Sequence, residues 1–325
     1  MTDVLSRIWL SRVWSGALLL AMLALCSCRR DSTSTQPAAG AIRVFVSIPP
    51  QKYFVERVGG EYVTVSVLLR PGQSPHTYDP TPKQMVELSS AQVYFRIGVP
   101  FEKQVVDKIA TVLKGLEIVD TREGIDTLVV DTEEHADHGT APDADHERHE
   151  QLGHDNEPDP HIWMNPRLVK RQARTICRAL CRLAHDHSES FERNCAALEA
   201  ELDHADARIA ATLAPLRGRA FYVFHPAFGY FADAYGLKQV AVETGGKQPS
   251  AKQLQALIER ARSAGVKLIF IQPQFTKQGA EAVAKAIGGA VVPLDPLAED
   301  YIANLMDVAS KIETALKDRR DKESD

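Results

Sequence analysis

The feature that most constrains the fold of this chain is an alternation of short β-branched segments with helical segments, broken once by a long helical stretch. Strand-like segments occupy residues 42–48, 62–69, 93–97 and 116–119, and then 220–224, 238–242, 267–271 and 290–293. Strands that alternate with helices indicate parallel sheets covered by helices on both faces. The pattern therefore predicts an α/β protein with two Rossmann-like lobes, each built on a parallel sheet.

The helical stretch between the two sets of strands predicts a rigid connection. One helix is expected from Pro166 to about Asp186, and a second over residues 188–213. The second has apolar side chains near helical spacing at Phe191, Cys195, Leu198, Leu202, Ala205 and Ile209. Its length of about 37 Å is enough to bridge two lobes. The predicted divisions are an N-terminal lobe over 42–187, a linking helix over 188–213 and a C-terminal lobe over 214–325.

The N-terminus has the pattern of a targeting segment. Arg7 and Arg12 precede an apolar run over residues 13–25. That run is short for a membrane span and suits the core of a signal peptide. We therefore predict a signal peptide over residues 1–27, with a plain membrane-anchor helix as the alternative.

A possible lipidation site follows the apolar run. The sequence Leu25-Cys26-Ser27-Cys28 resembles a bacterial lipobox, with Cys28 as the lipidated residue. Cys26 is the alternative, although Leu25 is a poor match for the small residue expected before a lipidated cysteine. Residues 28–41 are rich in small residues and predict a flexible, lipid-anchored tether. The mature protein is thus expected outside the cytoplasmic membrane, in the periplasm or at the cell surface.

Three histidines lie where predicted strands end or where a loop re-enters the fold. His76 follows the second strand, His225 follows the strand over 220–224, and His161 lies in the proline-flanked segment 159–166. Proline restricts both its own backbone and that of the residue before it, so His161 loses little freedom on binding a ligand. Open parallel sheets bind ligands outside the carboxyl ends of their strands. A site in a cleft between the two lobes is therefore predicted.

A carboxylate completes the predicted metal site. Asp295 follows the last strand, and three imidazoles with one carboxylate suit tetrahedral Zn²⁺. Each residue also has a structural interpretation. A histidine beside an aromatic residue is often only hydrogen-bonded, and Asp295 could cap a helix ahead of Pro296. The recurrence of His76, His161 and His225 at similar places favours the metal site.

An acidic segment over residues 132–159 is predicted to be a long solvated loop. Between Asp131 and Pro160 there are eleven Asp or Glu residues against one Arg. The segment has no apolar period, and it contains five histidines: His135, His138, His146, His149 and His154. These are candidates for auxiliary, weak zinc binding, and the alternative is a solubilising insert. With a net charge of −5 and no basic stripe, nucleic acid is not an expected partner.

Five motifs in order resemble a known family. They are Ser74-Pro75-His76-Thr77-Tyr78, Asp159-Pro160-His161-Ile162-Trp163, Phe224-His225, Ile269-Phe270-Ile271-Gln272-Pro273-Gln274-Phe275 and Leu294-Asp295-Pro296-Leu297. Over roughly residues 42–318 the chain resembles the metal-binding lipoproteins of ABC importers, the zinc-uptake ZnuA type. The resemblance implies a monomeric receptor, not an enzyme, that passes Zn²⁺ to a membrane permease. It also implies His76, His161 and His225 as ligands, with Asp295 as the candidate fourth.

Two positions depart from the family pattern. Pro75 stands where some zinc members have a glutamate that can reach the metal, which puts more weight on Asp295 or on a water. Gln272 stands where many members have Glu, so any supporting role there would fall to a neutral amide. His225 favours zinc, because manganese members often have a carboxylate there.

Other functions remain as alternatives. One is a manganese or iron receptor of the same fold. Another is a secreted zinc hydrolase with an open water position at the metal. The hydrolase is disfavoured because the chain has no His-Glu-x-x-His helix and no obvious general base beside any ligand.

The cysteines outside the lipobox are Cys177, Cys181 and Cys195. An oxidising compartment permits a disulfide. Cys181 and Cys195 are equally far in sequence from Ser188, the expected turn of a helical hairpin, so they could face each other. With a third cysteine present, the pairing stays open.

Overall fold

The computed structural model describes residues 40–112, 115–128, 158–241, 251–263, 265–275 and 277–323. These residues belong to one compact unit that runs from Pro37 to Asp325. The predicted signal peptide, Cys26, Cys28 and the five loop histidines lie outside the described residues. Within the described part of the chain, no helix is long and apolar enough to cross a membrane.

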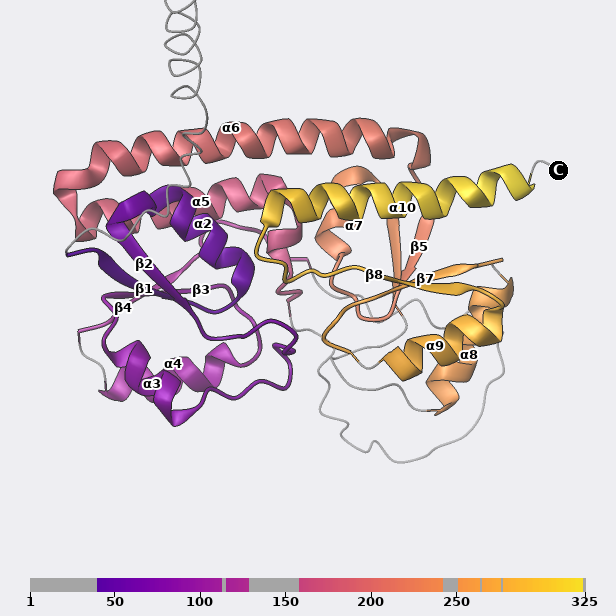
Figure 1. The fold of residues 1–325 in the computed structure, drawn as a ribbon, viewed down its shortest axis with the longest axis horizontal. Helices are drawn as coiled ribbons and strands as arrows, with labels where there is room; N and C mark the ends of the chain where they lie inside the picture. The colour runs from indigo at the N-terminus through magenta and orange to yellow at the C-terminus, as the bar shows by residue number, and fades with distance from the viewer. Residues whose placement is uncertain are drawn as a thin grey trace, which may run out of the picture. The chain divides into compact units, whose positions relative to one another are not determined.

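The N-terminal lobe is built on a four-stranded parallel sheet (Figure 1). Its strands are β1 (Ile42–Val46), β2 (Val63–Val67), β3 (Val93–Arg96) and β4 (Glu117–Asp120), in the order β2-β1-β3-β4. Val44 is opposite Val65 on one side and Val93 on the other, so the apolar centre of β1 is enclosed by its neighbours. The strand order reverses between β1 and β3, and the carboxyl ends of strands at such a point are the usual place for a ligand.

The C-terminal lobe repeats this arrangement. Its strands are β5 (Ala220–Val223), β6 (Lys238–Ala241), β7 (Leu268–Ile271) and β8 (Ala290–Pro293). They pair in parallel in the order β6-β5-β7-β8, with Ile269 opposite Val291. Each lobe therefore places its first strand inside the sheet and offers an equivalent ligand-binding edge. The prediction of two α/β lobes with parallel sheets is confirmed.

Helices cover both sheets. In the N-terminal lobe they are α2 (Pro49–Gly59), α3 (Pro82–Ser89) and α4 (Glu102–Val112). In the C-terminal lobe they are α7 (Gly229–Tyr235), α8 (Ala251–Ser263), α9 (Lys277–Ile287) and α10 (Tyr301–Glu323). In Figure 1, α3 and α4 lie on the opposite side of the first sheet from α2.

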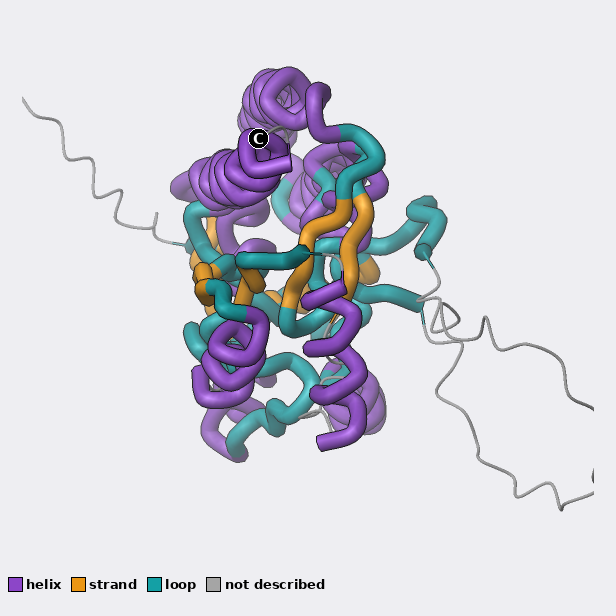
Figure 2. The backbone as a smooth tube through the Cα atoms, turned by 90° about the vertical axis from the view of Figure 1, so that its right-hand side faces the viewer, coloured by secondary structure: helices purple, strands orange, loops and turns teal. Residues whose placement is uncertain are grey.

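A helical hairpin joins the lobes. It consists of α5 (Pro166–Leu183) and the long helix α6 (Ser188–Leu213). The buried stripe of α6 contains every apolar residue that the sequence pattern selects, together with Leu213. This helix packs against α2 of the first lobe and against α7 and α10 of the second, and it extends along both lobes (Figure 1). Figure 2, turned by 90°, shows helices above and below the strands. The prediction of one long linking helix is confirmed.

Local signals explain where several helices begin. Thr81 caps α3 through a capping box with Gln84, and Asn165 caps α5 by accepting a hydrogen bond from Arg167 N–H. Pro49 and Pro50 directly follow the strand-like segment predicted over residues 42–48, and they are the first two residues of α2. Proline at a helix start loses no hydrogen bond and already has a helical φ, which explains the result.

The three cysteines of the helical hairpin are all free thiols. Cys177 and Cys195 are buried, and Cys181 is partly exposed. The Sγ atoms of Cys177 and Cys181 are 4.0 Å apart, one helical turn from each other on α5. Across the hairpin, Cys177 and Cys195 interact, and each shifts the pKa of the other. The contact across the hairpin thus involves Cys177, where sequence spacing suggested Cys181.

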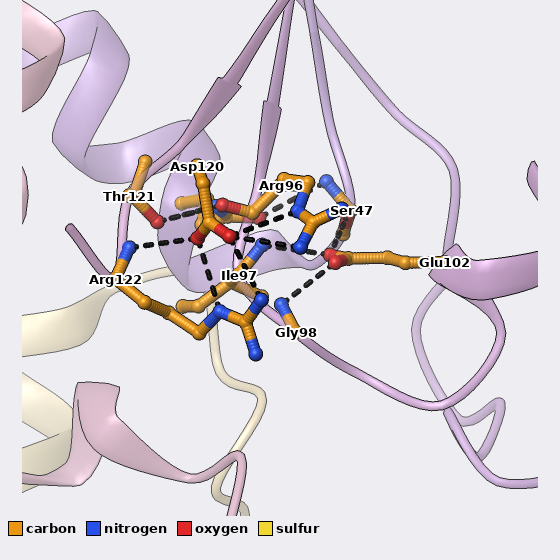
Figure 3. A network of polar contacts seen from close by, with 9 residues as sticks. Ser47, Arg96, Ile97, Gly98, Glu102, Asp120, Thr121 and Arg122 are labelled. Carbon is orange, nitrogen blue, oxygen red and sulfur yellow. Dashed lines mark hydrogen bonds and ion pairs between the residues drawn. The ribbon is translucent and has the colours of Figure 1, made fainter. Parts of the chain in front are cut away.

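A polar network joins the carboxyl ends of three strands in the N-terminal lobe (Figure 3). The buried carboxylate of Glu102 accepts hydrogen bonds from Ile97 N–H, Gly98 N–H and the Ser47 hydroxyl. Next to it, Asp120 pairs with the guanidinium groups of Arg96 and Arg122. Burial raises the pKa of Glu102 against the opposing effect of its hydrogen bonds. The network fixes the strand edge from which the loops of the candidate site leave.

Candidate metal centre

His76, His161 and His225 converge although they are far apart in the sequence. Each offers a ring nitrogen, and these three atoms all lie within 4.8 Å of one another. The Nε2 atoms of His76 and His225 are 3.1 Å apart. The imidazole centroids of His161 and His225 are separated by 5.3 Å. Among the described residues, these three histidines are the group whose ligand atoms lie close enough together to hold a metal ion.

The loop after β2 carries His76 into the site. Leu68 N–H and Leu69 N–H extend the pairing with β1 by donating to Val46 O and Ser47 O, and the Tyr78 hydroxyl donates to Leu68 O at 2.6 Å. Burial lowers the pKa of His76 to about 3, and the neighbouring His225 and His161 rings add to this effect. His76 is therefore a neutral imidazole at physiological pH, as a metal ligand must be.

A buried carboxylate orients His161. Asp159 Oδ1 accepts hydrogen bonds from the His161 backbone N–H at 2.9 Å and from its ring Nδ1 at 2.6 Å. Because Nδ1 is used as the donor, Nε2 is the ring atom left for a metal. In the sequence, Asp159 belongs to a family motif but has no predicted role of its own. The signal that could have found it is a carboxylate two residues before a proline-flanked histidine.

The position of Asp159 depends on the second lobe. The Tyr230 hydroxyl donates to Asp159 O at 3.0 Å and accepts from Leu128 N–H at 2.8 Å. Asp159 N–H also donates to Leu128 O at 2.9 Å, so a residue before the acidic segment is hydrogen-bonded to a residue at its end. A Cβ atom at Gly229 would lie 3.0 Å from Asp159 Oδ2, so the absence of a side chain there allows the close approach.

A neutral amide holds His225. Gln272 Oε1 accepts from His225 N–H at 3.1 Å, and Gln272 Nε2 donates to His225 O at 2.7 Å. Both side chains are buried, with 5% of His225 and 1% of Gln272 exposed. The Phe275 ring lies 5.2 Å from the His225 ring and covers one side of it. The Gln272 amide thus contacts the backbone of this histidine.

Trp163 forms hydrogen bonds to the C-terminal lobe beside the site. Its indole Nε1–H donates to Pro296 O at 2.7 Å, and Trp163 O accepts from the buried Tyr301 hydroxyl at 2.6 Å. The Trp163 ring also lies 5.1 Å from the His161 ring. Since Pro296 and Tyr301 belong to the C-terminal lobe, these bonds fix the distance between His161 and the segment that contains Asp295.

Asp295 is outside the group with converging ligand atoms, although its neighbour Pro296 lines the cavity beside the histidines. Its Oδ1 accepts from Leu297 N–H and from Gln274 Nε2, each at 2.9 Å. Its carbonyl oxygen accepts from Asn304 Nδ2 at 2.7 Å. Asp295 therefore stabilises the turn after β8. It does not cap a helix, the alternative weighed in the sequence, because α10 begins only at Tyr301.

The arrangement suits a small divalent cation. A tetrahedral Zn²⁺ with Zn–N distances of about 2.0 Å requires ligand nitrogens about 3.3 Å apart. The 3.1 Å separation between His76 and His225 is already close to this value. A cavity at this point is lined by the three histidines together with Trp163 and Phe275. The donor set is neutral imidazole, with the Asp159 carboxylate as the adjoining negative charge.

Comparison with known proteins identifies the family. The profile of the family described as zinc-uptake complex component A, periplasmic (ZnuA), matches residues 44–315. The chain belongs to this family. Proteins of the ZnuA family are solute-binding receptors rather than enzymes, and they act outside the cytoplasmic membrane as the metal-binding component of an uptake system.

Relatives by sequence agree with this membership. The zinc-binding lipoprotein AdcA of Streptococcus pneumoniae is 29% identical over 316 residues, which cover 94% of this chain and 61% of AdcA. Zinc-binding protein AdcA of Streptococcus pyogenes is 27% identical over 271 residues, or 80% of this chain and 51% of AdcA. The chain thus spans about half to two thirds of the length of these streptococcal proteins.

Solved structures share the fold. A crystal structure of ZnuA has a TM-score of 0.74 and 39% identity, covering 85% of this chain and 99% of that one. A zinc-bound deletion mutant of ZnuA matches with the same score and identity. The periplasmic zinc-binding protein TroA of Treponema pallidum has a TM-score of 0.72 at 21% identity, a likeness that concerns the fold alone.

Proposed function

We propose that this chain captures Zn²⁺ with His76, His161 and His225 and delivers it to the permease of an ABC importer. The observation that carries the proposal is the convergence of these three ring nitrogens within 4.8 Å, at the facing edges of two parallel sheets. The zinc-binding names of the AdcA relatives and the zinc-bound ZnuA structure support zinc as the cargo.

The ligand chemistry supports zinc over manganese or iron. Imidazole is a good ligand for Zn²⁺, whereas Mn²⁺ is better served by carboxylate and water oxygens. The converging group contains three imidazoles and no carboxylate. A metal-competition assay tests this choice: Zn²⁺ should displace Mn²⁺ completely at equal concentrations, and retention of Mn²⁺ would favour the manganese receptor.

The fourth ligand is proposed to be either Asp295 or a water molecule. The hydrogen bonds from Gln274 and Leu297 to the Asp295 side chain both fall on Oδ1, and Gln274 and Pro296 line the cavity. The variant Asp295→Asn separates the two possibilities. If the carboxylate is a ligand, zinc affinity should fall by more than about tenfold, and if water is the ligand it should change little.

The segments outside the described residues keep the roles predicted from sequence. We propose that Cys28 carries a lipid anchor and that the five loop histidines gather zinc weakly and pass it to the central site. A variant lacking residues 132–157 tests the loop. It should retain the tight site and lose the additional weak binding, whereas loss of the tight site would contradict this role.

A competitive zinc titration tests the central proposal. The parent chain, His161→Ala and His204→Ala are compared at pH 7.5, with His204 serving as an exposed histidine of α6 outside the site. Loss of an outer partner of a metal ligand costs about 10–100-fold in affinity, so loss of His161 itself should exceed about 100-fold. His204→Ala should bind as the parent does. Equal tight binding by His161→Ala would overturn the proposed site.

A further inference from the structure

A ladder of ion pairs sets the register of the helical hairpin. Along α5 and α6, Arg167 pairs with Asp206 at 2.9 Å, and Lys170 pairs with Asp203 at 2.5 Å. The third rung joins Arg174 Nε to the Glu199 carboxylate at 2.6 Å. Each step of three or four residues toward the turn on α5 is matched by an equal step on α6. The register is therefore defined by three independent contacts.

The next positions on both helices are cysteines. Cys177 lies three residues beyond Arg174 toward the turn, and Cys195 lies four residues beyond Glu199, so a pair of thiols follows the last ion pair. Both cysteines are buried, with 8% of Cys177 and 6% of Cys195 exposed. The interaction between the two thiols raises the pKa of Cys177 and lowers that of Cys195.

A third thiol provides access to this buried pair. Cys181 lies one turn beyond Cys177 on α5, with 4.0 Å between their Sγ atoms. It is the most exposed of the three cysteines and lies near the turn, where its Sγ is 3.9 Å from Ser188 O. An external disulfide can therefore reach Cys181 more easily than it can reach Cys177 or Cys195.

We propose that Cys177 and Cys195 are an oxidation site that forms an interhelical disulfide, and that Cys181 is its entry point. The oxidant is a disulfide, RSSR, as supplied in oxidising compartments outside the cytoplasmic membrane. The Cys181 thiolate attacks it and releases one RSH after proton transfer. The Cys177 thiolate then attacks Cys181 Sγ and releases the second RSH. Finally the Cys195 thiolate attacks Cys177 Sγ, which forms the Cys177–Cys195 bond and returns Cys181 to a thiol.

Geometry determines the direction of the last step. Side chains four residues apart on a helix have Cβ atoms about 5–6 Å apart, whereas a relaxed disulfide needs about 3.5–4.5 Å. A bond between Cys177 and Cys181 is therefore strained, and strained disulfides are exchanged more readily. The Cys177–Cys195 bond joins two facing helices and does not have this restriction. It would link α5 covalently to α6, in the hairpin that connects both lobes.

Thiol mapping of the full chain tests the site. The reduced protein is incubated with oxidised glutathione in the presence of a chelator, quenched with N-ethylmaleimide and digested for mass spectrometry. The expected product is a peptide pair linked through Cys177 and Cys195, with Cys181 alkylated. Alkylation of both Cys177 and Cys195 after oxidation would overturn the proposal, as would a stable link from Cys181 to either of them.

Two variants sharpen the test. Cys181→Ser should form the same linked peptide at least about fivefold more slowly, and an unchanged rate would overturn the entry role of Cys181. Oxidation should raise the Tm of the parent by several degrees and leave that of Cys195→Ala unchanged. Zinc titration serves as the folding control, because all variants retain His76, His161 and His225. An equal rise in the Tm of Cys195→Ala would contradict the Cys177–Cys195 bond.

Discussion

The two buried histidines of the site are held in different ways. His161 lies on a turn, and the Asp159 carboxylate binds both its ring and its backbone. His225 directly follows β5 and the buried Phe224, and the Gln272 amide binds only its backbone N–H and carbonyl groups. A ligand at the end of a strand is already directed by the sheet. A ligand on a turn needs a side chain to orient its ring.

Asp159 and Gln272 also differ in charge, so they should affect different properties of the protein. Asp159 places a negative charge next to His161, so it should contribute to the attraction of a cation. Gln272 is neutral and satisfies two buried polar groups, so it should contribute to folding. Substituting each residue in turn should move two different measurements, and this crossed pattern is the strongest test of the comparison.

The largest effect is expected for Gln272→Leu. It removes the acceptor of the buried His225 N–H and one of the two donors to His225 O, which also accepts from Ala227 N–H at 2.8 Å. The loss of a hydrogen-bond partner from a buried polar group costs about 1–3 kcal/mol. The free energy of unfolding, measured with urea in metal-free buffer, should fall accordingly, while zinc affinity should change less than tenfold. Gln255→Leu, at an exposed position on α8, is the control and should leave stability nearly unchanged.

Asp159→Asn should give the opposite result. The asparagine oxygen can still accept the two hydrogen bonds from His161, but the negative charge is lost. Zinc affinity should fall about 10–100-fold, the usual cost of changing the partner of a metal-bound histidine, with little change in stability. Asp126→Asn removes an exposed carboxylate as the control. If stability fell and affinity did not, the assigned roles of Asp159 and Gln272 would be wrong.

His76 adds a third case, because burial lowers its pKa to about 3. Below pH 6.5 the unfolded chain binds a proton at this residue and the folded chain does not. The stability of the metal-free protein should therefore fall as pH drops from about 6.5 toward about 3, by up to about 1.4 kcal/mol per pH unit. Urea unfolding of His76→Asn should show a shallower pH dependence, and an identical slope would contradict the assignment.

The smallest effect is expected for Tyr230→Phe. It removes the hydroxyl that bridges Leu128 N–H and Asp159 O, while the ring remains packed. Loss of one hydrogen bond of this kind costs about 0.5–1.5 kcal/mol. Zinc affinity should fall by less than about tenfold in a calorimetric titration. A loss as large as that of Asp159→Asn would mean that Tyr230 controls the carboxylate more directly than its backbone contact indicates.

Local patterns in the sequence were sufficient for the architecture and for selecting the three histidines whose ring nitrogens converge. Alternating strands and helices predicted both sheets, and the apolar spacing from Phe191 to Ile209 predicted the buried face of α6. His76, His161 and His225 were found because each follows a strand end or lies on a rigid turn. These signals are contained in short stretches of chain, where backbone preference and the spacing of apolar residues operate.

The tertiary structure decided which polar groups meet. Asp295 follows a strand as His225 does, but its Oδ1 accepts hydrogen bonds from the turn after β8. Cys195 faces Cys177 instead of Cys181, because the ion pairs set the register of the hairpin. Asp159 acquires its role from His161, Gly229 and Tyr230 together. Such contacts join residues distant in sequence, and they depend on how packed elements align, which no local pattern records.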